Sequence, residues 1–118
     1  DVFHEGPVWL SRIESLHVRA AGITDEDLKL ISERMPNLRV LNLARNPVSD
    51  DGLNVLTGMH QLEQLTLSRT KITGTGLKLL APLKKLQWLD LRDTDVAEDD
   101  MTELQTERPQ LRILAGSR

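Results

Sequence analysis

A block of leucine, two residues, leucine, one residue and leucine recurs along this 118-residue chain. Three copies are complete, namely Leu38-Leu41-Leu43, Leu62-Leu65-Leu67 and Leu86-Leu89-Leu91. A degenerate copy, Ile13-Leu16-Val18, precedes them, and a truncated copy, Leu111-Leu114, follows. The blocks start at residues 13, 38, 62, 86 and 111, so 24 or 25 residues separate them. A fixed period of this length predicts a stacked array of repeats.

Each repeat combines two hydrophobic periods. The inner leucines alternate with polar residues, as in Leu41-Asn42-Leu43, and this period of two predicts a short strand with one buried face. Apolar residues then recur at helical spacing, as in Leu28, Ile31 and Met35. Hydroxyl residues, which favour helix starts, precede these segments at Thr24, Ser49 and Thr73. Strands that always alternate with helices in the same order must run parallel and line one side of a curved array.

Residues 13 to 114 resemble the leucine-rich repeat proteins, whose consensus L-x-x-L-x-L-x-x-N/T/C-x-L the blocks follow. The ninth consensus position holds Ala21, Asn46, Thr70 and Thr94. The second half of the third repeat, Thr70-Lys71-Ile72-Thr73-Gly74-Thr75-Gly76-Leu77, is similar to helix-bearing repeats of the ribonuclease-inhibitor-like class, especially those of planctomycete-type bacterial proteins. The resemblance implies an α/β solenoid with a parallel concave β-sheet and convex α-helices.

We expect residues 1–118 to form a single repeat domain, a size that suits one core. Residues 1–12 are interpreted as an amino-terminal cap, because they contain apolar residues outside the repeat pattern. These residues are Phe3, Val8, Trp9 and Leu10. Full repeats start at 13, 38, 62 and 86, and residues 111–118 form a terminal partial repeat. The position of Leu30, Val55 and Leu79 becomes Glu103 in the fourth repeat. This change predicts that no helix follows the fourth one.

Composition excludes several kinds of site. The chain has no cysteine, so disulfides and thiolate metal ligands are absent. No apolar run approaches the roughly 18 residues that span a membrane, so we expect no membrane insertion. The pI near 5.6 and the lack of aromatics among the basic residues argue against a nucleic-acid partner. The sequence leaves the cellular compartment open.

Residues that could carry chemistry lack the partners that catalysis needs. Ser15 and His17 would lie on the same side of one strand, but no carboxylate is expected beside them, so we interpret them as ordinary strand residues. Acidic clusters such as Asp25-Glu26-Asp27 could suggest calcium, but helix starts explain them better. Gly74-Thr75-Gly76 has no lysine in the register of a phosphate-binding loop. We therefore expect no enzyme activity, no cofactor and no small-molecule substrate.

Outward-facing strand residues predict where a partner would bind. Trp88 is the one aromatic residue in these positions, and Ile113 is expected beside it, also exposed. Aromatic anchors contribute much of the binding energy of interfaces, although Trp88 could instead shield the last strand. The predicted surface joins the apolar residues Val40, Trp88 and Ile113 to the polar residues Asn42, Gln64, Thr66 and Asp90.

A row of arginines borders this surface where the strands leave the concave face, at Arg19, Arg45, Arg69 and Arg92. We include Arg45, Arg69 and Arg92 in the predicted binding surface. Such a row could hold an acidic protein loop, a phosphate or an RNA backbone. In the alternative interpretation it is a solvated row that Asp90 and Asp93 partly neutralise.

The sequence thus favours a module that recognises another protein through its concave face. One alternative is a structural or multimerising repeat unit, and another is a regulatory fragment of a larger catalytic protein. The final strand, Leu111 to Leu114, should be an open edge with Ile113 outward. We therefore expect a monomer or a weak homodimer formed through this carboxy-terminal edge.

Overall fold

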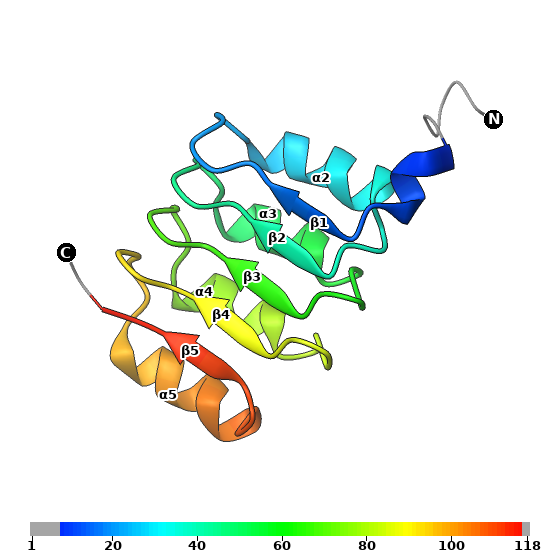
Figure 1. The fold of residues 1–118 in the computed structure, drawn as a ribbon. Coiled ribbons are helices and arrows are strands. Elements are labelled where there is room, and N and C mark those ends of the chain that lie inside the picture. Colours follow the sequence, from blue (N-terminus) through cyan, green and yellow to red (C-terminus); the bar gives the residue numbers. More distant parts are fainter. Residues whose placement is uncertain (1–7, 117–118) are drawn as a thin grey trace.

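The computed structural model describes residues 8–116, in which five short strands alternate with helices (Figure 1). The strands are β1 (Ser15–His17), β2 (Val40–Asn42), β3 (Gln64–Thr66), β4 (Trp88–Asp90) and β5 (Arg112–Leu114). The α-helices are α2 (Asp25–Arg34), α3 (Asp50–Leu56), α4 (Gly74–Leu77) and α5 (Glu98–Glu107). Two 3-10 helices complete the fold, η1 (Val8–Arg12) before β1 and η2 (Lys78–Leu80) directly after α4.

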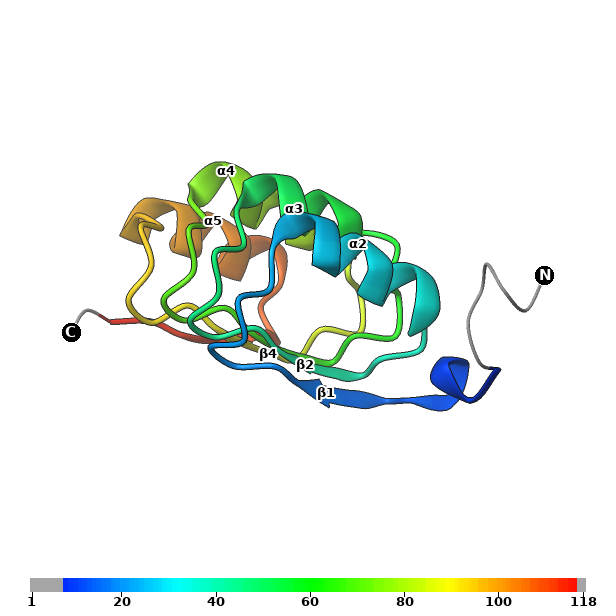
Figure 2. The same cartoon turned by 90° about the horizontal axis from the view of Figure 1, so that it is seen from above.

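The strands form one parallel sheet in the order of the sequence, β1-β2-β3-β4-β5. The middle residues of the first four strands pair in register, from Leu16 through Leu41 and Leu65 to Leu89. The helices cover one face of the sheet and leave the other face open (Figure 2). The predicted α/β repeat solenoid, with a parallel concave sheet and convex helices, is confirmed. We call the uncovered side of the sheet the concave strand face.

The core lies between the sheet and the helices and consists mainly of the repeated leucines. All nine leucines of the three complete blocks are at most 2% exposed. Leu28, Leu53, Leu56, Leu77, Leu80 and Leu83 close the core from the helical side. Burying a leucine side chain contributes about 1.5 to 3 kcal/mol, so this ladder supplies most of the force that stacks the repeats.

The helices begin where the sequence predicts. Thr24, Ser49 and Thr73 are the residues before α2, α3 and α4. Thr24 and Asp27 form a reciprocal capping box at the start of α2. α4 is short and continues as a 3-10 helix. Its two glycines, Gly74 and Gly76, disfavour longer helix.

A carboxylate joins neighbouring repeats at the first two helix starts. Asp25 accepts hydrogen bonds from the backbone nitrogen of Ser49 at 2.9 Å and from its hydroxyl at 2.6 Å. Asp50 accepts the same pair of bonds from Thr73, at 2.8 and 2.6 Å. Gly52 lies against the carboxylate of Asp25, and Gly76 lies against that of Asp50. A Cβ atom on either glycine would collide with the carboxylate. The acidic helix starts therefore also connect one repeat to the next.

The interpretation of Glu103 as a sign of the last helix is wrong. Glu103 lines a groove between α4 and α5, together with Leu77 and Lys78 of the preceding repeat. Its counterpart Leu30 is 48% exposed on α2, the first α-helix of the described residues. This helix position thus faces the preceding repeat, and Glu103 does not indicate whether another helix comes after α5.

The residues interpreted as the amino-terminal cap are only partly described. Phe3 and the side chain of Val8 lie outside the described residues, Leu10 is half-buried, and Trp9 is 60% exposed on η1. Asn37, in the turn after α2, donates a hydrogen bond from its side chain to the carbonyl of Ser11 at 2.8 Å. Within residues 8–116 no helix is long and apolar enough to cross a membrane.

Candidate functional site

The parallel register aligns the outward strand residues in two rows on the concave strand face. One row runs through Ser15, Val40, Gln64 and Trp88, and the other runs through His17, Asn42, Thr66 and Asp90. Each residue lies about 4.8 Å from its neighbour on the next strand. The predicted outward residues of the first four strands are therefore brought together on one surface.

A hollow of about 370 Å³ lies on this face, and we call it the strand-face hollow. Seven of the ten residues predicted to bind a partner line it, namely Asn42, Arg45, Thr66, Arg69, Trp88, Asp90 and Arg92. Arg19, Ala44, Ser68 and Asp93 complete the lining. Val40 and Gln64 lie on the same face in the row of Trp88 but outside the hollow. The surface is thus hollowed at the carboxyl ends of the strands.

The expected position of Ile113 is wrong by one residue. Ile113 pairs with Leu89, and Arg112 takes the place beside Trp88. The backbone fixes this register, because Arg112 donates to the carbonyl of Gln87 and Leu91 donates to the carbonyl of Leu114. A slip of one residue exchanges the two faces of a strand. Ile113 therefore packs against the core, and Arg112 is an exposed residue of the concave strand face that sequence reasoning missed.

Trp88 is less exposed than the sequence suggested. Its side chain is half-buried in the wall of the strand-face hollow. The large hydrophobic residues that are truly exposed within the described chain are Trp9 and Leu30, which lie elsewhere. Trp88 thus presents part of its surface inside a recess, with Arg112 on one side and Gln64 on the other.

The sequence suggested that Asp90 is free to form hydrogen bonds with a partner, but in the structure its side chain is already paired. Its side chain is 2% exposed and holds Arg92, whose Nη2 donates at 2.7 Å and whose Nε donates at 3.0 Å. These hydrogen bonds, with the charge of the carboxylate, raise the pKa of Arg92. The side chain of Arg92 itself stays 59% exposed. The carboxylate therefore fixes the base of an arginine whose far end reaches solvent.

The other arginines of the row differ in how they are held. Arg69 donates from Nε to Asp93 at 3.2 Å and is 45% exposed, whereas Asp93 is 16% exposed. The second oxygen of Asp93, Oδ1, is buried without a hydrogen-bond partner among the described residues. Arg45 forms no ion pair within residues 8–116. The predicted neutralisation of the row is therefore partial.

At the opposite ends of the strands, Arg39 forms ion pairs with two carboxylates. Arg39 donates from Nε to Glu63 at 2.9 Å and from Nη1 to Glu14 at 3.2 Å. The hydrogen bonds to Glu63 and Glu14 raise the pKa of Arg39, and the hydrogen bond from Arg39 lowers the pKa of Glu63. This arginine is shared between two exposed or half-exposed carboxylates. Arg39 therefore uses all three of its nitrogens for carboxylates, whereas Arg45 at the carboxyl ends of the strands has no ion pair within residues 8–116.

Ser15 and His17 lie within hydrogen-bond distance, with 3.1 Å between Oγ and Nε2. Both side chains are exposed, and no carboxylate orients His17 among the described residues. The acidic clusters occupy the first turns of α2, α3 and α5. In the described part of the chain no three histidine or acidic side chains converge as metal ligands would.

The comparisons with known proteins agree with this architecture. The family described as leucine rich repeat matches residues 36–96, just over half of the chain. No curated protein sequence matches significantly.

Several solved structures share the fold. The structure of leiomodin-1 Actin-Binding Site 2 has a TM-score of 0.69 at 18% identity, covering 98% of this chain and 75% of that one. Internalin C2 of Listeria monocytogenes has a TM-score of 0.62 at 20% identity, covering 90% of this chain and 52% of that one. An internalin F structure from the same species has a TM-score of 0.56 at 18% identity, covering 90% and 35%. The chain spans about half or less of the two internalins, and these low identities show the fold alone.

Proposed function

The chain belongs to the leucine-rich repeat family, and on this premise we propose that it recognises another protein through its concave strand face. Repeat solenoids of this kind commonly serve as protein-interaction modules, since they present extended binding surfaces. One of the similar structures is an actin-binding site, which is in keeping with such a role for the scaffold. No catalytic constellation among the described residues competes with this proposal.

The strand-face hollow is the observation that carries the proposal. It gathers Trp88, polar residues and arginines on the side of the sheet that no helix covers (Figure 2). An aromatic residue in a recess with a polar border is the usual arrangement of an interface anchor. Val40, Gln64 and Arg112 extend the surface beyond the hollow.

Binding to a partner captured from the source cells tests the proposal. Trp88→Ala should weaken binding by about 2 kcal/mol or more. Because Trp88 is half-buried, Thr66→Arg provides a second test, in which a long side chain fills the hollow. Lys78→Glu, on the helical side, serves as the control, and circular dichroism verifies the fold of each variant. Binding that survives both hollow substitutions but is lost with Lys78→Glu would place the functional surface on the helices.

A second candidate function is self-association through the carboxy-terminal end. A hollow of about 630 Å³ opens there between α5 and β5 and includes Leu91, Met101 and Ile113. Such a surface could bind a second copy, which fits the predicted weak homodimer. In sedimentation velocity, Ile113→Glu should convert any dimer to monomer, whereas Leu30→Glu at the opposite end should not. A dimer that survives Ile113→Glu would place the contact elsewhere.

We also propose finer assignments that rest on sequence. Residues 1–118 act as one domain with a cap at 1–12, and the repeats belong to the ribonuclease-inhibitor-like class. The ten-residue helices α2 and α5 support this class, because it is the helix-bearing one. A bacterial source and a regulatory role within a larger catalytic protein stay predictions.

A further inference from the structure

The strand-face hollow carries a positive surplus in a chain of negative net charge. Its lining contains four arginines and two aspartates, whereas the whole chain has a net charge of −3. The two signs also lie at different depths. The side chains of Asp90 and Asp93 are 2% and 16% exposed, whereas those of Arg92 and Arg69 are 59% and 45% exposed. A molecule that enters the hollow therefore meets guanidinium groups before it meets carboxylates.

These arginines keep hydrogen-bond donors free. Arg69 uses Nε for Asp93, and Arg92 uses Nε and Nη2 for Asp90, so terminal nitrogens of both remain available. Arg19 and Arg45 have no ion pair within residues 8–116. A guanidinium that is held at its base and free at its tip is oriented for planar acceptors such as carboxylates.

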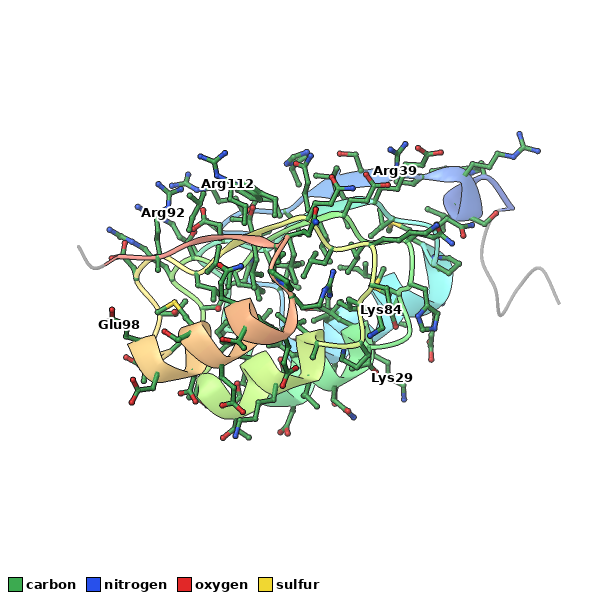
Figure 3. The ribbon with its side chains drawn as sticks, turned by 90° about the horizontal axis from the view of Figure 1, so that it is seen from below. Lys29, Arg39, Lys84, Arg92, Glu98 and Arg112 are labelled. Carbon is green, nitrogen blue, oxygen red and sulfur yellow. The ribbon has the colours of Figure 1, made fainter. Side chains whose placement is uncertain are left out.

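Arg112 extends the same charge beside Trp88. The register places Arg112 next to Trp88, and Figure 3 shows Arg112 and Arg92 projecting from the sheet on the side away from the helices. At the opposite ends of the strands Arg39 is not available in this way, because Glu14 and Glu63 share its guanidinium. The arginines with free donors therefore gather at the carboxyl ends of the strands, and Arg112 adds a further positive charge from the first residue of β5.

Resting on the proposed function, we propose that the partner presents an extended acidic segment to this hollow. Its carboxylates pair with Arg45, Arg69 and Arg92, and an apolar side chain contacts Trp88. Five strands at about 4.8 Å spacing span about 19 Å, which an extended chain covers in about six residues. The ion pairs raise the association rate and make it dependent on salt.

Fluorescence titration with a defined peptide tests this proposal. The probe is a peptide of about twelve residues, twice the span, in which Glu alternates with Gly around a central Leu. A second peptide with Gln in place of Glu has the same shape without the charge. The chain has two tryptophans, so Trp88 becomes the single reporter in a Trp9→Phe background. We expect the Glu peptide to change Trp88 emission and to bind at least tenfold more tightly than the Gln peptide.

Two charge reversals locate the binding. Arg45→Glu should weaken the Glu peptide at least tenfold, and Lys29→Glu should weaken it less than twofold. Lys29 is the matched control, because it carries the same charge on α2, on the far side of the molecule (Figure 3). Equal losses in the two variants would overturn the proposal, because they would indicate a general effect of net charge.

The remaining outcomes separate this proposal from the function on which it rests. Equal binding of the Glu and Gln peptides at Trp88 would overturn the acidic preference and leave the concave strand face as the binding surface. Single-stranded oligouridylate that binds as tightly as the Glu peptide would overturn an acidic protein segment in favour of RNA. If neither peptide changes the fluorescence emission of Trp88, and a captured partner binds the helices, both proposals are wrong.

Discussion

The carboxylate between the first two repeats makes Gly52→Ala an informative substitution. In an ordinary helix interior, replacing glycine with alanine stabilises the protein by about 1 kcal/mol. At Gly52 the added methyl group would occupy the place of the Asp25 carboxylate, which receives two hydrogen bonds from Ser49. We therefore expect the substitution to have the opposite sign here.

The magnitude can be worked out from these two bonds. A hydrogen bond to a charged group contributes about 1.5 to 3 kcal/mol, and the lower end applies because the site is only partly buried. Displacing the carboxylate from Ser49 should thus cost about 3 kcal/mol. The gain in helix propensity offsets about 1 kcal/mol, so the free energy of unfolding should fall by about 2 kcal/mol.

Urea unfolding, monitored by circular dichroism, measures this effect in a double-mutant cycle with Asp25→Ala. Once the carboxylate is gone, the new methyl group still lies 3.1 Å from Val48 Cγ1, which can shift slightly. Gly52→Ala should then be neutral or stabilising, which gives a coupling energy of about 2 to 3 kcal/mol. Gly58→Ala is the control, because a methyl group there has no heavy atom within 4 Å.

Two results would refute this reasoning. Stabilisation by Gly52→Ala in the otherwise unchanged protein would mean that the carboxylate contributes nothing at this junction. An equal cost with and without Asp25 would assign the effect to the helix or to Val48.

Three further predictions concern stability. Leu65→Ala should lower the free energy of unfolding by about 2 to 5 kcal/mol through a cavity between repeats, whereas Thr66→Ala should cost under about 1 kcal/mol; similar losses in urea would contradict the register. Arg108→Met should cost about 1.5 to 3 kcal/mol in the same assay, because the guanidinium donates to four backbone carbonyls in the segment that leads into β4, those of Ala81, Leu83, Lys84 and Leu86; no loss would show that water replaces these bonds. The hydrogen bond from Arg39 lowers the pKa of Glu63, so this pairing stabilises the fold above the usual carboxyl pKa, about 4.3. The stabilisation is lost as the pH falls below that value. The melting temperature of Arg39→Gln should therefore fall less on acidification than that of the unchanged protein.

The repeat period made the first four strands predictable from sequence. Leu41, Leu65 and Leu89 are 24 residues apart and pair directly, because both hydrophobic periods agree with one fold. The last strand lacks the third leucine of the block, so its register depends on backbone hydrogen bonds that no residue pattern encodes. Leu111 stays buried as the block predicts. The block spacing placed Ile113 beside Trp88, but Ile113 pairs with Leu89 instead. That single residue brought Arg112 onto the concave strand face.

The sequence predicted on which side of the sheet the candidate site residues lie, but not their burial or their ion pairs. Alternation along β4 correctly placed Trp88 and Asp90 on the sheet side away from the helices. Alternation cannot show that Arg92, two residues after Asp90, folds back over its carboxylate and covers it. The ion pair and the burial of Asp90 become visible only when side chains are placed.

The junctions between helix starts show a further rule that no single repeat contains. Asp25 lies against Gly52 and Asp50 against Gly76, so the earlier repeat supplies the carboxylate and the later one the glycine. At the third junction the roles are reversed, because Gly74 of the earlier repeat lies against Asp100 of the later one. Each of the three junctions thus holds one carboxylate opposite one glycine.

This rule connects the stability of the array to the charge of its surface. Acidic residues at the helix starts are committed to junctions and helix caps, where glycine and hydroxyl partners position them. The arginines that come after the strands have fewer carboxylates within reach, and Asp90 and Asp93 bind two of them from beneath. A chain with more acidic than basic residues can therefore present a basic hollow, since many of its acidic residues lie at the helix starts, where Asp25 and Asp50 connect neighbouring repeats.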